Sequence, residues 1–255
     1  MKRIIVIILS SMAVGYVIGC ALLFFFQRSF LYHPTPETKL SGSTSSSLTN
    51  KDSTLKIWTR SVDRSDAVIY FGGNAEDVSN SFLRFSTLLP NHNLYFVNYR
   101  GYGGSTGTPT EAGLFSDALA VYDSIQDKHR NISVIGRSLG SGVAVYLAAN
   151  RKVDKLVLVT PYDSIENVAK KSFPIFPVSL ILQDRFDSAS RVANIETPTL
   201  VIEAENDDVI PRANSAALAA RFPTGQVVVK VIVGANHNSI GMAQEYFDLV
   251  IGFLK

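Results

Sequence analysis

The chain has 255 residues, a formal net charge of +2 and a hydrophobic fraction of 46%. With an apolar N-terminal segment set aside, this length leaves room for one domain of about 220 residues. Lys and Arg are scattered without a basic run, which argues against a nucleic-acid-binding protein. The single cysteine, Cys20, excludes a disulfide framework and a Cys/His metal-ligand pattern, and the sequence predicts no metal and no cofactor.

Residues 4–26 form an apolar segment without a charge, preceded by Lys2 and Arg3 and followed by Gln27 and Arg28. The segment is long enough to span a bilayer, and it is longer than the apolar region of about 7 to 15 residues found in cleaved signal peptides. Residues 1–28 are therefore predicted to be a single-pass membrane anchor. Because positive charge is retained in the cytoplasm, Lys2 and Arg3 place the following domain on the extracytoplasmic side.

A lipoprotein signal is the alternative for this segment. Val17-Ile18-Gly19-Cys20 resembles a lipobox in which Cys20 would be lipidated. Residues 21–26 are apolar, whereas polar residues usually follow such a cysteine, so the uncleaved anchor is favoured.

Residues 29–54 are predicted to be a connector, because residues 41–47 are small and polar with nothing to bury. From residue 55 to 255, short β-branched or aromatic runs alternate with longer helical patterns. Strands are predicted at residues 55–58, 67–71, 94–98, 132–136, 156–159, 200–204 and 227–233, and helices at 79–89, 110–128, 139–149, 212–222 and 240–254. Apolar strands separated by amphipathic helices indicate an α/β domain with a mostly parallel central sheet and helices on both faces.

Gly136-Arg137-Ser138-Leu139-Gly140 lies between a predicted strand and a predicted helix. A serine on so sharp a turn needs nearly absent side chains two residues before and after it, because those positions crowd against the strand and the helix. The pattern therefore predicts a nucleophile elbow with Ser138 as the nucleophile.

A serine nucleophile needs an imidazole base that is oriented by a carboxylate. Among the four histidines, His237 follows the last predicted strand, at the sheet edge where Ser138 is also expected. The acid is expected after the strand at 200–204, in Glu205-Asn206-Asp207-Asp208. The chain order Ser138, Asp207, His237 is typical of an α/β-hydrolase, but the pattern alone does not choose between the neighbouring acids.

The oxyanion of acyl transfer needs backbone N–H donors. One is expected from Leu139, directly after the nucleophile, and the other from Asn74 in the small-residue loop Phe71-Gly72-Gly73-Asn74-Ala75. A second glycine-rich loop, residues 101–107, does not match a dinucleotide or phosphate-loop pattern and is interpreted as structural.

The chain resembles the α/β-hydrolase superfamily, especially single-span membrane-anchored members with a small cap that are related to the serine aminopeptidase-like hydrolases. The stretches that carry this resemblance span most of residues 70–240. They are YFGGNAED, NYRGYGGSTGTPTEAGL, GRSLGSGVA, TPYDSI, FPVSLILQDRFDS, ENDDVIP and GANHNSI.

In the family pattern the acid stands four residues before the proline of D-x-x-V/I-P, and the resemblance thus implies Asp207 as the catalytic acid. Two positions depart from the pattern. Gly72 stands where many relatives carry histidine, and Ala204 where many carry glycine. The first departure affects the predicted oxyanion loop, and neither affects the triad.

The sequence therefore predicts a membrane-anchored serine hydrolase that cleaves small-molecule or lipid acyl esters or thioesters through an acyl-enzyme on Ser138. An aminopeptidase-like amide hydrolase and a catalytically silent binding protein of the same fold are the alternatives. The short interval between residues 159 and 200 predicts only a small cap, whose apolar residues 172–177 and 180–182 either line an acyl pocket or pack on the sheet.

Overall fold

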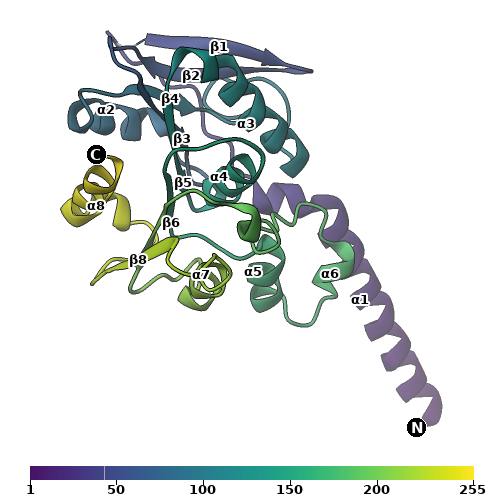
Figure 1. The fold of residues 1–255 in the computed structure, drawn as a ribbon. Helices are drawn as coiled ribbons and strands as arrows, with labels where there is room; N and C mark the ends of the chain where they lie inside the picture. Colours follow the sequence, from purple (N-terminus) through teal and green to yellow (C-terminus); the bar gives the residue numbers. More distant parts are fainter. Residues whose placement is uncertain (43) are drawn as a thin grey trace.

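The computed structural model describes residues 1–42 and 44–255, and these form one eight-stranded sheet in the order β1-β2-β4-β3-β5-β6-β7-β8 (Figure 1). The strands are β1 Thr44–Asn50, β2 Ser53–Arg60, β3 Asp66–Phe71, β4 Asn93–Val97, β5 Asn131–Arg137, β6 Leu156–Val159, β7 Thr199–Ala204 and β8 Val227–Ile232. β2 is antiparallel to both β1 and β4, whereas the neighbours from β4 to β8 are parallel. The prediction of a mostly parallel α/β sheet is confirmed.

Helices cover both faces of the sheet. The α-helices are α1 Lys2–Leu31, α2 Val78–Leu88, α3 Glu111–Ile125, α4 Leu139–Asn150, α5 Ile165–Ser172, α6 Val178–Ile181, α7 Arg212–Ala219 and α8 Gln244–Leu254. Buried residues of α3, α4 and α7 belong to one hydrophobic cluster, and those of α2 and α8 belong to a second cluster across the sheet. The sheet is therefore the middle layer of three.

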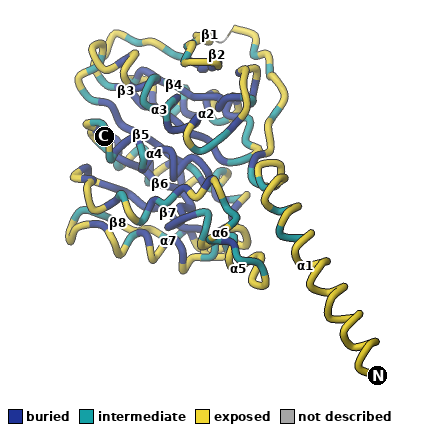
Figure 2. The backbone as a smooth tube through the Cα atoms, turned by 90° about the vertical axis from the view of Figure 1, so that its right-hand side faces the viewer, coloured by how far each residue is buried: buried dark blue, intermediate teal, exposed yellow. Residues whose placement is uncertain are grey.

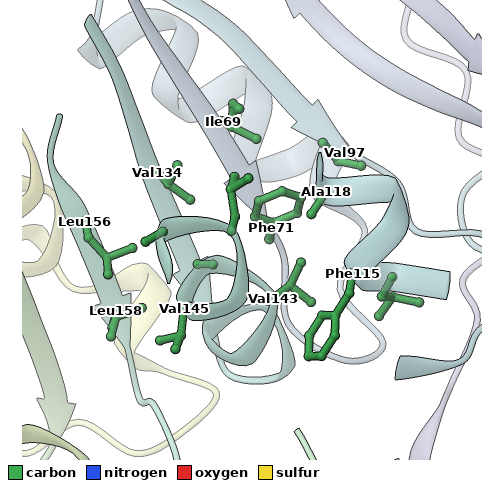
Figure 3. Packing of buried hydrophobic residues seen from close by; sticks show 14 of the residues in the cluster. Ile69, Phe71, Val97, Phe115, Ala118, Val134, Val143, Val145, Leu156 and Leu158 are labelled. Carbon is green, nitrogen blue, oxygen red and sulfur yellow. The ribbon is translucent and has the colours of Figure 1, made fainter. Parts of the chain in front are cut away.

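Alternating side chains of each central strand supply these two clusters. In β3, Ile69 and Phe71 belong to the α3/α4 side, while Val68 and Tyr70 belong to the α2/α8 side. Figure 3 shows Phe71 among residues of α3 and α4, including Val143. Because both faces are buried, these strands read in the sequence as continuous apolar runs rather than alternating ones.

Strand β1 differs from the sequence-based expectation. A connector is predicted over residues 29–54, but Thr44–Asn50 pair along their whole length with β2 as an antiparallel edge strand. The prediction of an irregular segment is wrong for these residues, and Ser43 lies outside the described residues. Most β1 side chains are exposed, so the backbone ladder, and not apolar burial, holds the strand, and no hydrophobic alternation marks it in the sequence.

Helix α1 is long and apolar enough to cross a membrane by length and composition, a property that a signal sequence shares. It extends away from the domain and is exposed over most of its length (Figure 2). Its C-terminal part lies beside α6, in the segment between β6 and β7 (Figure 1). We call residues 165–184 of that segment the cap.

Candidate active site

Ser138 occupies a sharp turn between β5 and α4, with φ 48° and ψ −116°. A positive φ is strained for a residue with a side chain. A Cβ on Gly140 would lie 2.1 Å from the carbonyl oxygen of Phe71, and one on Gly136 would lie 2.4 Å from the carbonyl oxygen of Gly140. Both contacts are impossible, so the elbow requires glycine on each side of the serine.

The structure brings the three predicted catalytic residues together at the carboxyl ends of the strands. Ser138 Oγ lies 2.9 Å from His237 Nε2, and His237 Nδ1 lies 2.9 Å from Asp207 Oδ2. All three side chains are largely buried, with the Asp207 side chain only 3% exposed. The arrangement allows the imidazole to take the serine proton while the carboxylate holds the other ring nitrogen.

In the loop after β7, the contacts of Asp207 differ from those of the neighbouring acids. Asp207 Oδ1 also accepts the backbone N–H groups of Val209, at 3.0 Å, and Ile210, at 2.7 Å, which orient the carboxylate. Asp208 is exposed. Glu205 instead accepts the N–H of Gly234.

The two predicted oxyanion donors line the same pocket as Ser138. Leu139 is the first residue of α4, where backbone N–H groups are free of helical partners. The loop after β3 passes close to the serine, since a Cβ on Gly73 would lie 3.6 Å from Ser138 Cβ. The N–H of Gly73 is already donated to Glu76 Oε2, at 2.7 Å, which leaves the N–H of Asn74 as the donor that this loop offers.

The Asn74 side chain is held by two segments outside its own loop. Its Oδ1 accepts the His33 N–H at 2.9 Å and the Tyr102 hydroxyl at 2.8 Å, and its Nδ2 donates to the carbonyl oxygen of Leu31 at 2.7 Å. Burial raises the pKa of Tyr102 to about 12, so its hydroxyl remains a donor. Leu31 and His33 belong to the segment predicted as a connector, and Tyr102 belongs to the glycine-rich loop 101–107. Both segments therefore hold the side chain of Asn74 in the oxyanion loop.

Sequence reasoning missed a buried ion pair beneath the site. Arg137, inside the elbow motif, donates to Glu76 Oε2 at 3.1 Å and to the carbonyl oxygen of His237 at 3.2 Å. Burial opposes the charge of Arg137, but Glu76, Tyr70 and Tyr246 together outweigh it, and the pKa of the guanidinium lies above its ordinary value. Glu76 thus links the oxyanion loop to the histidine loop. An arginine within the elbow and an acid two residues after Asn74 were the only sequence signals of this link.

A pocket with a volume of about 400 Å³ opens beside Ser138 and His237. Its walls combine α5 residues such as Ile165 and Ala169 with Phe30 and Leu31 from the end of α1. Within residues 1–42 and 44–255, no cluster of three or more His, Cys, Asp or Glu side chains is placed to hold a metal.

A strained serine at a strand-to-helix turn, hydrogen-bonded to a histidine and a carboxylate on this sheet, defines a serine hydrolase of the α/β-hydrolase fold. The sequence family described as "Serine hydrolase (FSH1)" matches residues 97–233. The chain belongs to the α/β-hydrolase superfamily of serine hydrolases.

Two relatives align with most of this chain. The uncharacterized protein Rv2307c of Mycobacterium tuberculosis is 36% identical over 182 residues, which cover 68% of this chain and 63% of the relative. Alpha/beta hydrolase domain-containing protein 17C of Xenopus tropicalis is 28% identical over 195 residues, covering 74% of this chain and 61% of the relative. The alignments thus span less than two thirds of the length of these relatives.

Among solved structures, an esterase of Pyrococcus furiosus, Pf2001, superposes with a TM-score of 0.72 at 20% sequence identity. The match covers 88% of this chain and 98% of the esterase. At this identity the likeness establishes the fold.

Proposed function

We propose that this protein is a membrane-anchored serine hydrolase that cleaves carboxylic ester or thioester bonds through an acyl-enzyme on Ser138. The observation that carries the proposal is the continuous hydrogen-bonded series from Ser138 through His237 to Asp207, next to the backbone N–H groups of Leu139 and Asn74.

The residues have complementary roles in two half-reactions. Ser138 Oγ attacks the carbonyl carbon while His237 Nε2 takes its proton, and the N–H groups of Leu139 and Asn74 stabilise the oxyanion. The protonated imidazole then gives its proton to the leaving alcohol or thiol. A water molecule, deprotonated by His237, then attacks the carbonyl carbon of the acyl-enzyme. The bond to Ser138 Oγ breaks, His237 returns its proton to that oxygen, and the carboxylic acid is released.

The apolar pocket favours acyl groups over peptides. Apart from the catalytic groups, its walls near the serine are formed mainly by aliphatic and aromatic side chains of the cap and of α1. Such a surface gains free energy from each buried methylene of a substrate but offers few partners for peptide amides. The length and composition of α1 support an anchor that holds this pocket near a membrane.

Labelling with a fluorophosphonate probe tests the nucleophile. The wild-type protein should be labelled, and Ser138→Ala should abolish both labelling and hydrolysis of p-nitrophenyl esters. Ser141→Ala is the matched control, because Ser141 donates only to the carbonyl oxygen of Ser138 within the helix. Labelling of Ser138→Ala at the wild-type level would contradict the proposal, and a preference for aminoacyl amides over esters would favour an aminopeptidase-like activity.

A further inference from the structure

A second cavity adjoins the catalytic pocket. It lies between the C-terminal part of α1 and the cap, has a volume of about 130 Å³, and is partly open to the surroundings. We call it the α1–cap groove.

The lining of the α1–cap groove is almost entirely apolar. Gln27 is its only polar lining residue, and the amide of Gln27 is already used by the carbonyl oxygens of Phe24 and Ile181 and by the N–H of Gln183. Both the nitrogen and the oxygen of this amide therefore already have partners within the protein. The groove therefore favours a hydrocarbon chain.

The α1–cap groove is next to the catalytic pocket and shares lining residues with it. Phe30, Leu31, Ile165, Ala169 and Phe173 line both cavities. A linear acyl group whose carbonyl carbon lies at Ser138 would reach the groove by passing between these shared residues. The far end of the groove is lined by residues that do not reach the catalytic pocket, among them Leu23 and Ile181.

Polar contacts hold α1 against the cap and thereby keep the α1–cap groove formed. Arg28 donates to Asp184 at 3.0 Å, and the Tyr32 hydroxyl donates to the same carboxylate at 3.1 Å. Further towards the N-terminus, the Tyr16 ring stacks on Phe176, with ring centroids 5.7 Å apart. The cap therefore follows α1 well into its apolar part.

The cap also has exposed apolar side chains beside α1. Ile175 is 71% exposed and Leu180 is 83% exposed, next to a helix that is itself apolar and exposed. Exposed apolar surface of this kind marks a membrane contact when it continues from a membrane-length helix. The open side of the groove would then face lipid.

We propose that the α1–cap groove binds the acyl chain of a single-chain membrane lipid ester, which enters from the bilayer between α1 and the cap. This proposal rests on the proposed function of Ser138 and specifies its substrate class. The groove offers space for one chain, and a monoacyl lipid can occupy it without a second chain that would have to remain in the bilayer.

Chain-length profiles of two neighbouring variants test the groove in the full-length protein in detergent micelles. For the wild type, kcat/KM on p-nitrophenyl esters should rise by up to about fourfold per added methylene, since each buried methylene contributes about 0.8 kcal/mol. Ile181→Trp should lower kcat/KM for long-chain esters at least about tenfold, equivalent to the loss of two methylenes. For p-nitrophenyl acetate, kcat/KM of this variant should stay within about twofold of the wild-type value, because position 181 is remote from the ester bond.

Leu180→Trp is the matched control, because the same side chain is added at the adjacent but exposed position, outside both cavities. It should leave the profile unchanged. If Ile181→Trp and Leu180→Trp give the wild-type profile, the groove proposal is overturned while ester hydrolysis by Ser138 stands. If Ser138 is not labelled and no ester is cleaved, both proposals fail.

An alkyl fluorophosphonate with a diazirine at the chain end gives a second test that does not depend on a variant. After labelling of Ser138 and irradiation, cross-links should form to residues 23–31 of α1 or 178–182 of the cap. Cross-links confined to the other side of the pocket, at residues 207–210 or 237–238, would overturn the proposal.

Proteoliposomes test the lipid source of the chain. A long-chain monoacylglycerol in the bilayer should be hydrolysed, and Ile181→Trp should slow this reaction by the same factor as it slows long-chain p-nitrophenyl esters. Preference for a soluble S-acylated peptide over the bilayer lipid would overturn the lipid assignment.

Discussion

At the residue scale, Asp207 and Asp208 are adjacent but differ in what their carboxylates contact. Asp207 is buried against His237, whereas Asp208 is exposed. Asp207→Asn should lower kcat by about 10⁴-fold, because the amide no longer holds the imidazole in the productive tautomer. Asp208→Asn should leave kcat nearly unchanged. Steady-state kinetics on one ester would reveal the opposite ranking, which would assign the catalytic acid to Asp208.

Glu76 is a second residue whose effect on the active site depends on its contacts. Its carboxylate accepts the Gly73 N–H, the Arg137 guanidinium and the hydroxyls of Tyr70 and Ser81. Glu76→Gln replaces one acceptor oxygen by an NH₂ group and removes the charge that pairs with Arg137.

We expect Glu76→Gln to lower kcat by about 10-fold to 100-fold with KM unchanged, somewhat less than the loss of an oxyanion donor itself. Exposed Glu245 in α8 supplies the control, since Glu245→Gln keeps the same chemical change away from the site. Equal kcat values for the two variants would show that the Glu76 link does not position the oxyanion and histidine loops.

At the element scale, the contact between α4 and the end of β3 depends on the absence of a side chain at position 140. Gly140→Ala would place a methyl group 2.1 Å from the carbonyl oxygen of Phe71, and strand or helix would have to move. The free energy of unfolding should fall by about 1–3 kcal/mol. Fluorophosphonate labelling should be lost with it.

Gly252 in α8 provides a control in which the free energy of unfolding should change in the opposite direction. A Cβ there meets nothing within 4 Å, and Gly252→Ala should raise the free energy of unfolding by about 0.5–1 kcal/mol because alanine loses less backbone entropy in a helix. Urea denaturation would measure both variants. A similar loss of stability in both would show that helical glycine, and not the β3 contact, is responsible for the effect at position 140.

At the scale of the whole molecule, the charges at the ends of α1 predict its orientation in a membrane. Lys2 and Arg3 are the first two residues of the helix. Arg28 lies in its last turn and is already paired with Asp184. The amino terminus should therefore be cytoplasmic and the catalytic domain extracytoplasmic. Protease added to spheroplasts should digest the domain. Complete protection, with digestion only after lysis, would reverse this topology.

Much of the architecture was predictable because the central strands and their helices carry strong local patterns. The strands from β3 to β7 are buried along most of their length, and the glycines around Ser138 are required by local crowding. Strand β1 was not predictable, because its side chains remain exposed and only its pairing with β2 determines its conformation. The short cap helices α5 and α6 likewise have too few residues to show a period.

The sequence by itself determined the fold class, the nucleophile elbow and the candidate triad order, since each depends on residue types at short spacing along the chain. Only the tertiary structure distinguished Asp207 from its neighbours by contact, linked Glu76 to Arg137, and placed the end of α1 against Asn74 and the cap. These contacts join residues far apart in sequence, such as Arg28 and Asp184. Their partners are determined by the packing of whole elements around one sheet, which no local pattern records.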